Sequence, residues 1–242
     1  MKKNLNLTPT SQDALIVTDI QLDFLPGGAL PVAEGDLLVP VINDYVRIFE
    51  KAKSKVIASR DWHPANHMSF TAQGGPWPSH CVQDSDGAKF HPDLKLPKDV
   101  LVVSKATDPA KEAYSVFDGT GLAETLRSLG VTRLFFCGLA TDYCVVNSVL
   151  DARRLGLDTF VLVDATRGIN VKPGDVERAL DAMVKNGAVL VSLADFPEPE
   201  VLVGDESPVE VAGDRPLLKV ETKKKARMRP KGSYKRVRRE RG

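Results

Sequence analysis

Three residues with reactive side chains stand at the ends of short apolar runs. Asp19 follows ALIVT, Lys105 follows VLVVS, and Cys144 follows TRLFFC after one tight loop. Ligands bind outside the carboxyl ends of strands in open parallel sheets, so this carboxylate, ammonium and thiol could meet there. A helix N-terminus and a nearby cation favour the nucleophilic thiolate, and a carboxylate can accept the thiol proton. The three side chains together predict nucleophilic catalysis by Cys144.

Each of these residues also has an ordinary explanation when it is taken alone. An aspartate at a strand end often caps a turn, a lysine there is usually solvated, and a cysteine at a helix start is often a small buried residue. Their coincidence at one sheet edge favours the catalytic interpretation. The loop over residues 138–143, GLATDY, adds backbone N–H groups beside the thiol that could hold an oxyanion.

A second group of side chains has the composition of a metal site. Asp61 and His63 alternate by two in DWHPANH, so an extended chain presents both on one side. His80 returns from a loop that prolines and a tryptophan could stiffen. Carboxylate and imidazole ligands suit Zn²⁺, Fe²⁺ or Mn²⁺. Ordinary loop histidines are the alternative; His67 is open between ligand, hydrogen-bonding partner and turn residue, and His91 is left as an ordinary loop residue.

The elements that must position these groups alternate between strands and helices. Short, non-alternating apolar runs are typical of strands covered on both faces, and they fall at residues 14–18, 55–59, 100–104, 132–137, 159–163 and 188–192. Helical patterns fall at residues 36–53, 120–129, 144–155 and 174–186, most of them ending at a glycine. The first helix should bury the stripe Leu37, Leu38, Val41, Tyr45, Ile48 and Phe49. This rhythm predicts a doubly wound, mainly parallel six-stranded sheet with helices on both faces.

Composition divides the chain into a body and a tail. Residues 219–242 hold twelve Lys/Arg and two Glu, a net charge of +10, which leaves −9 on the rest. We therefore expect one α/β domain over residues 1–195, an acidic, proline-containing linker over 196–216 and a basic, disordered tail over 217–242. Three cysteines are too few for a disulfide framework, and no apolar segment has the length of a signal peptide or a membrane span. A cytoplasmic protein is expected.

These motifs together resemble the nicotinamidase branch of the isochorismatase-like cysteine hydrolase family. The matching segments cover most of residues 14–193 in the family's order, and they are residues 16–32, 59–70, 74–94, 105–122, 137–152 and 161–169. The resemblance implies an isochorismatase-like hydrolase fold and an amidohydrolase that converts nicotinamide to nicotinate and ammonia in NAD salvage. Pyrazinamide is a further substrate that it allows, and homo-oligomers are common in the family.

The resemblance also implies roles for individual residues. It makes Asp19 the general base and acid, Lys105 the third triad member and Cys144 the nucleophile. One divalent metal ion, with zinc favoured over iron or manganese, would be held by Asp61, His63 and His80, and His67 lies where some members supply a further ligand. A cis peptide bond between Leu139 and Ala140 would aim the N–H of Ala140, with that of Cys144, at the oxyanion. Phe24, Leu30, Trp77 and Tyr114 would enclose the pyridine ring.

Two other interpretations stay open. Related amidases that act on ureido or carbamoyl compounds generally lack the Asp-x-His metal motif, so Asp61, His63 and His80 argue against them. Isochorismatases lack the nucleophilic cysteine, so Cys144 argues against those. The basic tail has the Lys/Arg density of segments that bind nucleic acid through counterion release, which would make the chain an enzyme domain tethered to nucleic acid. A solubilising extension is the alternative for the tail.

Overall fold

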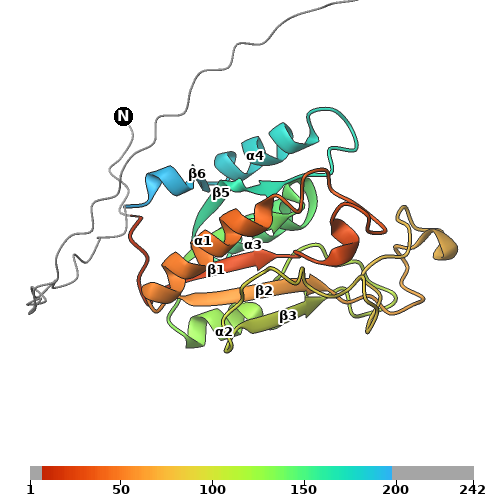
Figure 1. Cartoon of the computed structure of the whole chain (residues 1–242), viewed down its shortest axis with the longest axis horizontal. Helices are drawn as coiled ribbons and strands as arrows, with labels where there is room; N and C mark the ends of the chain where they lie inside the picture. Colours follow the sequence, from red (N-terminus) through yellow and green to blue (C-terminus); the bar gives the residue numbers. More distant parts are fainter. Residues whose placement is uncertain (1–6, 198–242) are drawn as a thin grey trace, which may run out of the picture. The chain divides into compact units, whose positions relative to one another are not determined.

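A single six-stranded sheet forms the centre of the protein in a computed structural model, which describes residues 7–197 (Figure 1). All neighbouring strands pair in parallel, in the order β3-β2-β1-β4-β5-β6. The strands are β1 Asp13–Thr18, β2 Lys55–Asp61, β3 Leu101–Lys105, β4 Arg133–Leu139, β5 Asp158–Arg167 and β6 Val189–Val191. The predicted fold class is therefore confirmed, and the sheet is parallel throughout.

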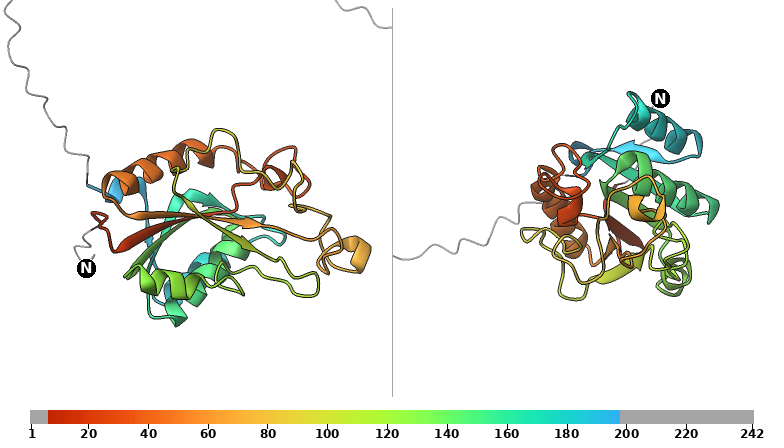
Figure 2. Two further views of the ribbon diagram at one scale, coloured as in Figure 1. Left: turned by 90° about the horizontal axis from the view of Figure 1, so that it is seen from below. Right: turned by 90° about the vertical axis from the view of Figure 1, so that its right-hand side faces the viewer.

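Helices cover both faces of this sheet and bury a separate apolar core on each (Figure 2). Helix α1, Leu38–Lys51, lies on one face, where its apolar side packs with β1 residues such as Leu15 and Val17. The other face carries α2 Leu122–Ser128, α3 Val146–Arg154 and α4 Asp175–Lys185. Successive residues of β1 thus serve opposite cores, which explains why its sequence is apolar without alternation.

The buried face of α1 differs from the predicted stripe. The helix begins at Leu38, and Leu37 is 58% exposed at its N-terminal end. Val41 and Ile48 are only partly buried. The buried residues are Leu38, Val39, Ile42, Tyr45, Val46 and Phe49. The stripe therefore lies about one position along the helix from the predicted one, because α1 carries more apolar residues than one face needs and the sequence alone does not choose among them.

The point where the strand order reverses lies between β1 and β4. The chain runs outward from β1 through β2 to β3, and then returns to β4 on the other side of β1. Sheets of this kind bind ligands in the crevice at that switch point, outside the carboxyl ends of the strands. The long loop over residues 62–100 begins at that end of β2 (Figure 1). It contains one short 3-10 helix, η2 over Thr71–Gln73.

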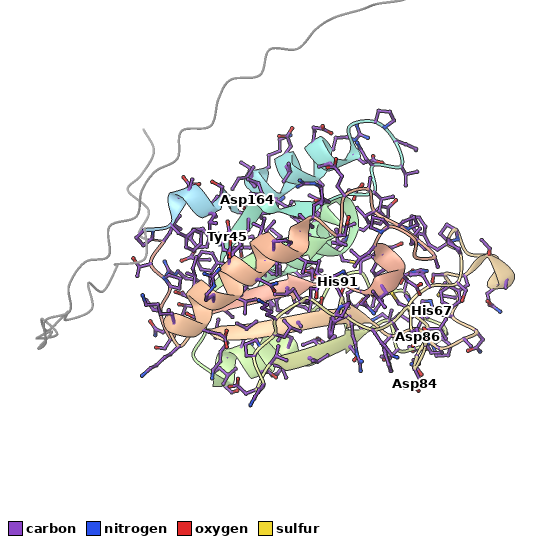
Figure 3. The ribbon with its side chains drawn as sticks, in the orientation of Figure 1. Tyr45, His67, Asp84, Asp86, His91 and Asp164 are labelled. Carbon is purple, nitrogen blue, oxygen red and sulfur yellow. The ribbon has the colours of Figure 1, made fainter. Side chains whose placement is uncertain are left out.

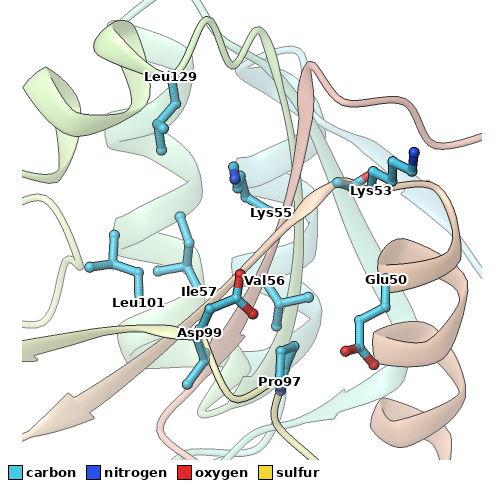
Figure 4. A pocket seen from close by; sticks show the side chains of 11 residues that line it. Glu50, Lys53, Lys55, Val56, Ile57, Pro97, Asp99, Leu101 and Leu129 are labelled. Atoms are coloured by element: carbon cyan, nitrogen blue, oxygen red, sulfur yellow. The ribbon is translucent and has the colours of Figure 1, made fainter.

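The opposite end of the sheet offers a hollow with different chemistry (Figure 4). Lys55 and Val56 at the start of β2 line it, together with Glu50 and Lys53 around the end of α1. Its lining contains no cysteine or histidine. The reactive residues predicted from the sequence are therefore not in this hollow.

The end of the described chain closes one core. Phe196 is buried against Tyr45 and Phe49 of α1, one residue beyond the predicted end of the domain. The rest of the predicted linker and the whole basic tail lie outside the described residues. Within residues 7–197, no helix combines the length and apolarity that a bilayer crossing requires.

Candidate active site

Asp19, Lys105 and Cys144 come together at the switch point of the sheet. Asp19 follows β1, Lys105 is the last residue of β3, and Cys144 lies just before α3. The Nζ atom of Lys105 is 2.9 Å from Oδ2 of Asp19 and 3.3 Å from Sγ of Cys144. All three residues are buried, with Lys105 only 1% exposed, so their charges act on one another with little solvent screening.

The Asp19 carboxylate is held by one oxygen and leaves the other available. Its Oδ1 atom accepts a 2.7 Å hydrogen bond from the Ser59 hydroxyl on β2. Its Oδ2 atom faces Lys105 but accepts no well-directed hydrogen bond from the described residues. Asp19 also has a φ of 52°, a conformation that non-glycine residues rarely adopt outside functional sites and tight turns. The arrangement leaves an oxygen that can take up a proton.

Cys144 lies in a single π-helical turn, η3 over Thr141–Val145, that leads into α3. The peptide bond between Leu139 and Ala140, just before this turn, is cis. Gly138 allows β4 to reach this point, because a Cβ atom there would lie 2.0 Å from the Thr18 carbonyl oxygen and the residue has a φ of 103°. The turn thus places the thiol directly beside the end of β1.

Burial dominates the protonation of the thiol. It raises the pKa of Cys144 well above its ordinary value, and this outweighs the lowering effect of Lys105. Lys105 favours the thiolate, as the sequence predicted, but the burial of the sulfur outweighs this effect, and helix α3 begins only at Val146. Burial alone would lower the pKa of Lys105, but Asp19, Asp61 and Cys144 raise it well above its ordinary value. The resting site holds a neutral thiol beside a protonated lysine.

Asp61, His63 and His80 form the second group. One ligand atom from each lies within 4.8 Å of the others, and all three residues are buried. The Nδ1 atoms of His63 and His80 face backbone carbonyl oxygens, at 3.1 Å and 2.7 Å. A carbonyl can only accept a hydrogen bond, so each Nδ1 carries the proton and each Nε2 keeps a lone pair for a metal ion.

The protonation and hydrogen bonding of Asp61 and His63 suit the binding of a metal cation. Burial, with His80 and His67 close by, lowers the pKa of His63 to about 3, so its ring stays neutral. The side-chain amide of Gln21 bonds both the N–H and the carbonyl of Asp61, at 2.7 Å and 2.8 Å, and fixes that residue. Two imidazoles and a carboxylate suit a transition-metal ion better than Mg²⁺ or Ca²⁺. The residues present therefore fit the metal that the sequence predicted.

The two groups share Asp61. Its carboxylate forms a close ion pair with Lys105 while it also faces His63 and His80. One of its oxygens, one of Asp19 and the sulfur of Cys144 lie within 4.8 Å of one another. A metal ion held by Asp61 would therefore lie next to the nucleophile.

The other two histidines differ from this pair. His67 is fully buried, with its ring 4.4 Å from that of His63, and its ligand atom lies within 4.8 Å of one from His63 and one from Glu112. His91 lies away from His67 (Figure 3), and its Nδ1 atom accepts a hydrogen bond from the backbone of Asp93. His91 therefore has a local role in its own loop.

Aromatic side chains from four segments lie around the site. Trp77 donates a 3.0 Å hydrogen bond from Nε1 to the Tyr114 hydroxyl, and both rings contact Tyr143, at 5.2 Å and 5.5 Å between centroids. Phe24 lies against His80 at 5.4 Å. Leu30 is partly buried and packs against the core cluster that includes Phe24. The rings of Trp77, Tyr114 and Tyr143 are partly exposed and offer an apolar surface that suits a flat ring, whereas Phe24 is buried.

Several of these positions were not predicted from the sequence. Ser59 and Gln21 orient the two key aspartates, and Tyr143 joins the aromatic group. Asp23 accepts a 2.7 Å hydrogen bond from the N–H of Cys81, which ties the segment carrying Phe24 to the loop carrying His80. Ser59 lies 40 residues from its partner Asp19, so only the parallel pairing of β1 with β2 brings them together. For Tyr143, the one available signal was its position next to Cys144.

A parallel α/β sheet that buries a cysteine beside a carboxylate and a lysine at its switch point defines the class of the α/β cysteine hydrolases. Comparison with known proteins narrows this class. Residues 13–195 match the model of the isochorismatase domain. The chain therefore belongs to the isochorismatase domain family.

The similar proteins within this family include nicotinamidases and a pyrazinamidase. The chain is 41% identical over 206 residues to the nicotinamidase of Escherichia coli (strain K12), covering 76% of this chain and 97% of that protein. The pyrazinamidase of Pyrococcus horikoshii, solved in complex with zinc, is similar with a TM-score of 0.72 and 52% identity over 75% of this chain and 99% of that one. PnC1 from L. infantum, solved in complex with nicotinate, gives a TM-score of 0.74 and 37% identity over 80% and 99% of the two chains.

Proposed function

We propose that this chain hydrolyses nicotinamide to nicotinate and ammonia and so supplies nicotinate for NAD salvage. The observation that carries the proposal is the contact of Lys105 with both Asp19 and Cys144, directly beside the Asp61 carboxylate. Nucleophile, proton acceptor and metal-binding group share one buried site. The similarity to nicotinamidases over most of the chain supports the choice of substrate.

The reaction begins with a proton transfer inside the buried group. Asp19 takes the proton of Cys144 through its available oxygen, and Lys105 stabilises the thiolate that forms. The thiolate attacks the carboxamide carbon, and the N–H groups of Ala140 and Cys144 hold the oxyanion. Losing one such donor typically costs ~2.7–4 kcal/mol of transition-state stabilisation.

Asp19 then completes three further proton transfers. It protonates the amide nitrogen, the C–N bond breaks, ammonia leaves, and a thioester to Cys144 remains. Asp19 next removes a proton from water, and the hydroxide attacks the thioester carbon. The C–S bond breaks, nicotinate leaves, and Asp19 returns its proton to the sulfur of Cys144. Burial raises the pKa of Asp19 although Lys105 lowers it, which makes this carboxylate a stronger base than an exposed one.

Asp61, His63 and His80 would hold one zinc ion in this proposal, although the same ligands also accept iron or manganese. The bound ion would hold the ring nitrogen of the substrate and orient the ring. The zinc complex of the P. horikoshii relative supports this choice.

Phe24, Leu30, Trp77 and Tyr114 would bind the ring of the substrate. Trp77 packs against Tyr143, and Phe24 packs against the metal-binding His80, so in this proposal the flat heterocycle lies beside both rings. Pyrazinamide shares the ring shape and the carboxamide, and we expect it to be accepted as well.

Ammonia release from nicotinamide tests the proposal. The wild-type chain should release ammonia, a chelator should stop the release, and added zinc should restore it. Cys144→Ala should have no turnover while it retains its metal. Near-native kcat in Cys144→Ala would show that the nucleophile is wrong. Activity on ureido compounds alone, with no metal bound, would favour the related amidases instead.

The basic tail supports a second proposal, that the chain binds nucleic acid. Its net charge of +10 suits a polyanion such as nucleic acid. A retardation assay at physiological salt should show binding by the full chain and none after truncation near residue 216; equal behaviour of both would remove this proposal. A cytoplasmic location and a homo-oligomer stay predictions, and the three free cysteines agree with the first.

A further inference from the structure

His67 uses both of its ring nitrogens within the protein. Its Nδ1 atom lies 2.7 Å from the hydroxyl of Ser69, and its Nε2 atom lies 3.1 Å from the carbonyl oxygen of Lys111. The backbone N–H of Ser69 also points at Nδ1, at 3.3 Å. The side chain is fully buried among loops beyond the carboxyl end of β2 (Figure 3).

These partners decide where the proton of the ring lies. The Lys111 carbonyl can only accept, so Nε2 carries the proton, and Nδ1 accepts from Ser69. Neither nitrogen of His67 keeps a lone pair for a metal ion. His63 and His80 have the opposite arrangement, with Nδ1 protonated and Nε2 unprotonated. His67 can become a ligand beside His63 only if it gives up one of its own hydrogen bonds.

The hydrogen bond from His67 Nε2 to the Lys111 carbonyl joins two loops that each carry part of the ring pocket. The loop over residues 62–81 holds Trp77, whose N–H donates to the Ser69 carbonyl at 3.0 Å. The loop over residues 106–118 holds Tyr114, three residues after Lys111. A second bond, from the N–H of Met68 to the Pro109 carbonyl at 2.8 Å, runs beside the His67–Lys111 bond. The Trp77–Tyr114 bond is thus a third contact between the two loops that the His67–Lys111 and Met68–Pro109 bonds join.

We propose that His67 is a positioning residue and not a metal ligand. It holds the segment of Lys111 against the metal-binding loop, and through this contact it sets the place of Tyr114 relative to Trp77. Its loss weakens binding of the ring amide and leaves the affinity for the metal intact. This inference rests on the proposed function, because the ring pocket is the one assigned to nicotinamide.

The test uses two substitutions that separate hydrogen bonding from metal binding. His67→Gln keeps a donor and an acceptor on a side chain that is a poor ligand for zinc, whereas His67→Leu keeps bulk and removes both bonds. His91→Gln is the matched control, because it makes the same change at a histidine that lies away from His67 (Figure 3). For each full-length protein, zinc affinity is measured by competition with a chelating dye, and kcat and KM by ammonia release from nicotinamide.

We expect the zinc affinity of both His67 variants to stay within about threefold of wild type. KM should rise about tenfold in His67→Leu, the loss expected for one or two hydrogen bonds, and return close to wild type in His67→Gln. Should His67→Leu fail to fold, Ser69→Ala replaces it, with a smaller rise in KM. Loss of zinc affinity by tenfold or more in His67→Gln would make His67 a ligand and overturn the inference. An unchanged KM in His67→Leu, or in Ser69→Ala where it replaces that variant, would overturn it too. A wild-type chain without activity on nicotinamide would refute the proposed function instead.

Discussion

Replacing Lys105 with methionine removes the cation that contacts Asp19, Asp61 and Cys144 together. The substitution keeps the length and the apolar part of the side chain. It deletes the ammonium 3.3 Å from the Cys144 sulfur and 2.9 Å from the Asp19 carboxylate. The site then contains two neighbouring carboxylates, Asp19 and Asp61, with no cation between them.

The size of the effect follows from these distances. Two unit charges 3.3 Å apart attract by about 5 kcal/mol at an effective dielectric constant of about 20. Loss of this attraction from a thiolate would lower the rate by between three and four powers of ten, at about 1.4 kcal/mol each. Asp19 becomes a stronger base once Lys105 no longer lowers its pKa, and this offsets part of the loss. We expect kcat to fall about a thousandfold.

The substitution should also shift the dependence of kcat on pH in a defined direction. Without Lys105, the pKa of Asp19 rises further, so the ionised base is lost at a higher pH and the acidic limb of kcat moves upward. The assay is ammonia release between pH 5 and 9, with metal content measured in the same samples. Lys89→Met, an exposed lysine paired with Asp86, is the control and should leave the profile unchanged. A kcat of Lys105→Met within tenfold of wild type, at equal metal content, would refute the reasoning.

Two other perturbations test stability. Because folding lowers the pKa of His63 from 6.5 to about 3, its contribution is complete above pH 6.5 and is lost as the pH falls towards 3. Between pH 6.5 and 3, the metal-free wild-type protein should lose up to about 5 kcal/mol more free energy of unfolding than metal-free His63→Gln. The free energies come from urea titrations at each pH, and the same pH dependence in both proteins would contradict the lowered pKa of His63. Gly138→Ala should lose at least 3 kcal/mol, since its Cβ would lie 2.0 Å from the Thr18 carbonyl oxygen, whereas Gly119→Ala, with open space, should lose about 1 kcal/mol. Similar midpoints of thermal unfolding for the two alanine variants would rule out the close approach at Gly138.

The fold could be predicted because its strands are buried on both faces. Runs such as ALIVT in β1 serve a core on each side, and no exposed face interrupts them with polar residues. The stripe on α1 was less accurate, because Val39, Ile42 and Val46 are as apolar as the residues first chosen. Periodicity identifies a helix more securely than it identifies which of several apolar faces is buried.

The reactive residues could be predicted because they follow strands directly. Asp19 and Lys105 each follow or end a strand, and parallel strands bring their carboxyl ends to one edge. Their hydrogen-bonding partners could not be predicted in this way. Ser59 lies within β2 and Gln21 in a loop, and no local pattern marks either as a contact of an aspartate 40 residues away.

Burial was the property that sequence reasoning estimated least well. A lysine at a strand end is usually solvated, yet Lys105 is almost completely enclosed by two carboxylates and a thiol. The same burial raises the pKa of Cys144, so the thiolate has to be formed during the reaction instead of being present beforehand. These effects depend on the loops that close over the site, and loops carry little periodic signal in the sequence.

The most direct test of the central claim is to trap the acyl-enzyme. The wild-type protein is mixed with nicotinamide, quenched with acid within one turnover, and digested for mass spectrometry. We predict a nicotinoyl group on the peptide that contains Cys144, and none on the corresponding peptide of Cys144→Ala. Full turnover of nicotinamide with no adduct at Cys144 at any quench time, and with activity retained in Cys144→Ala, would contradict the account.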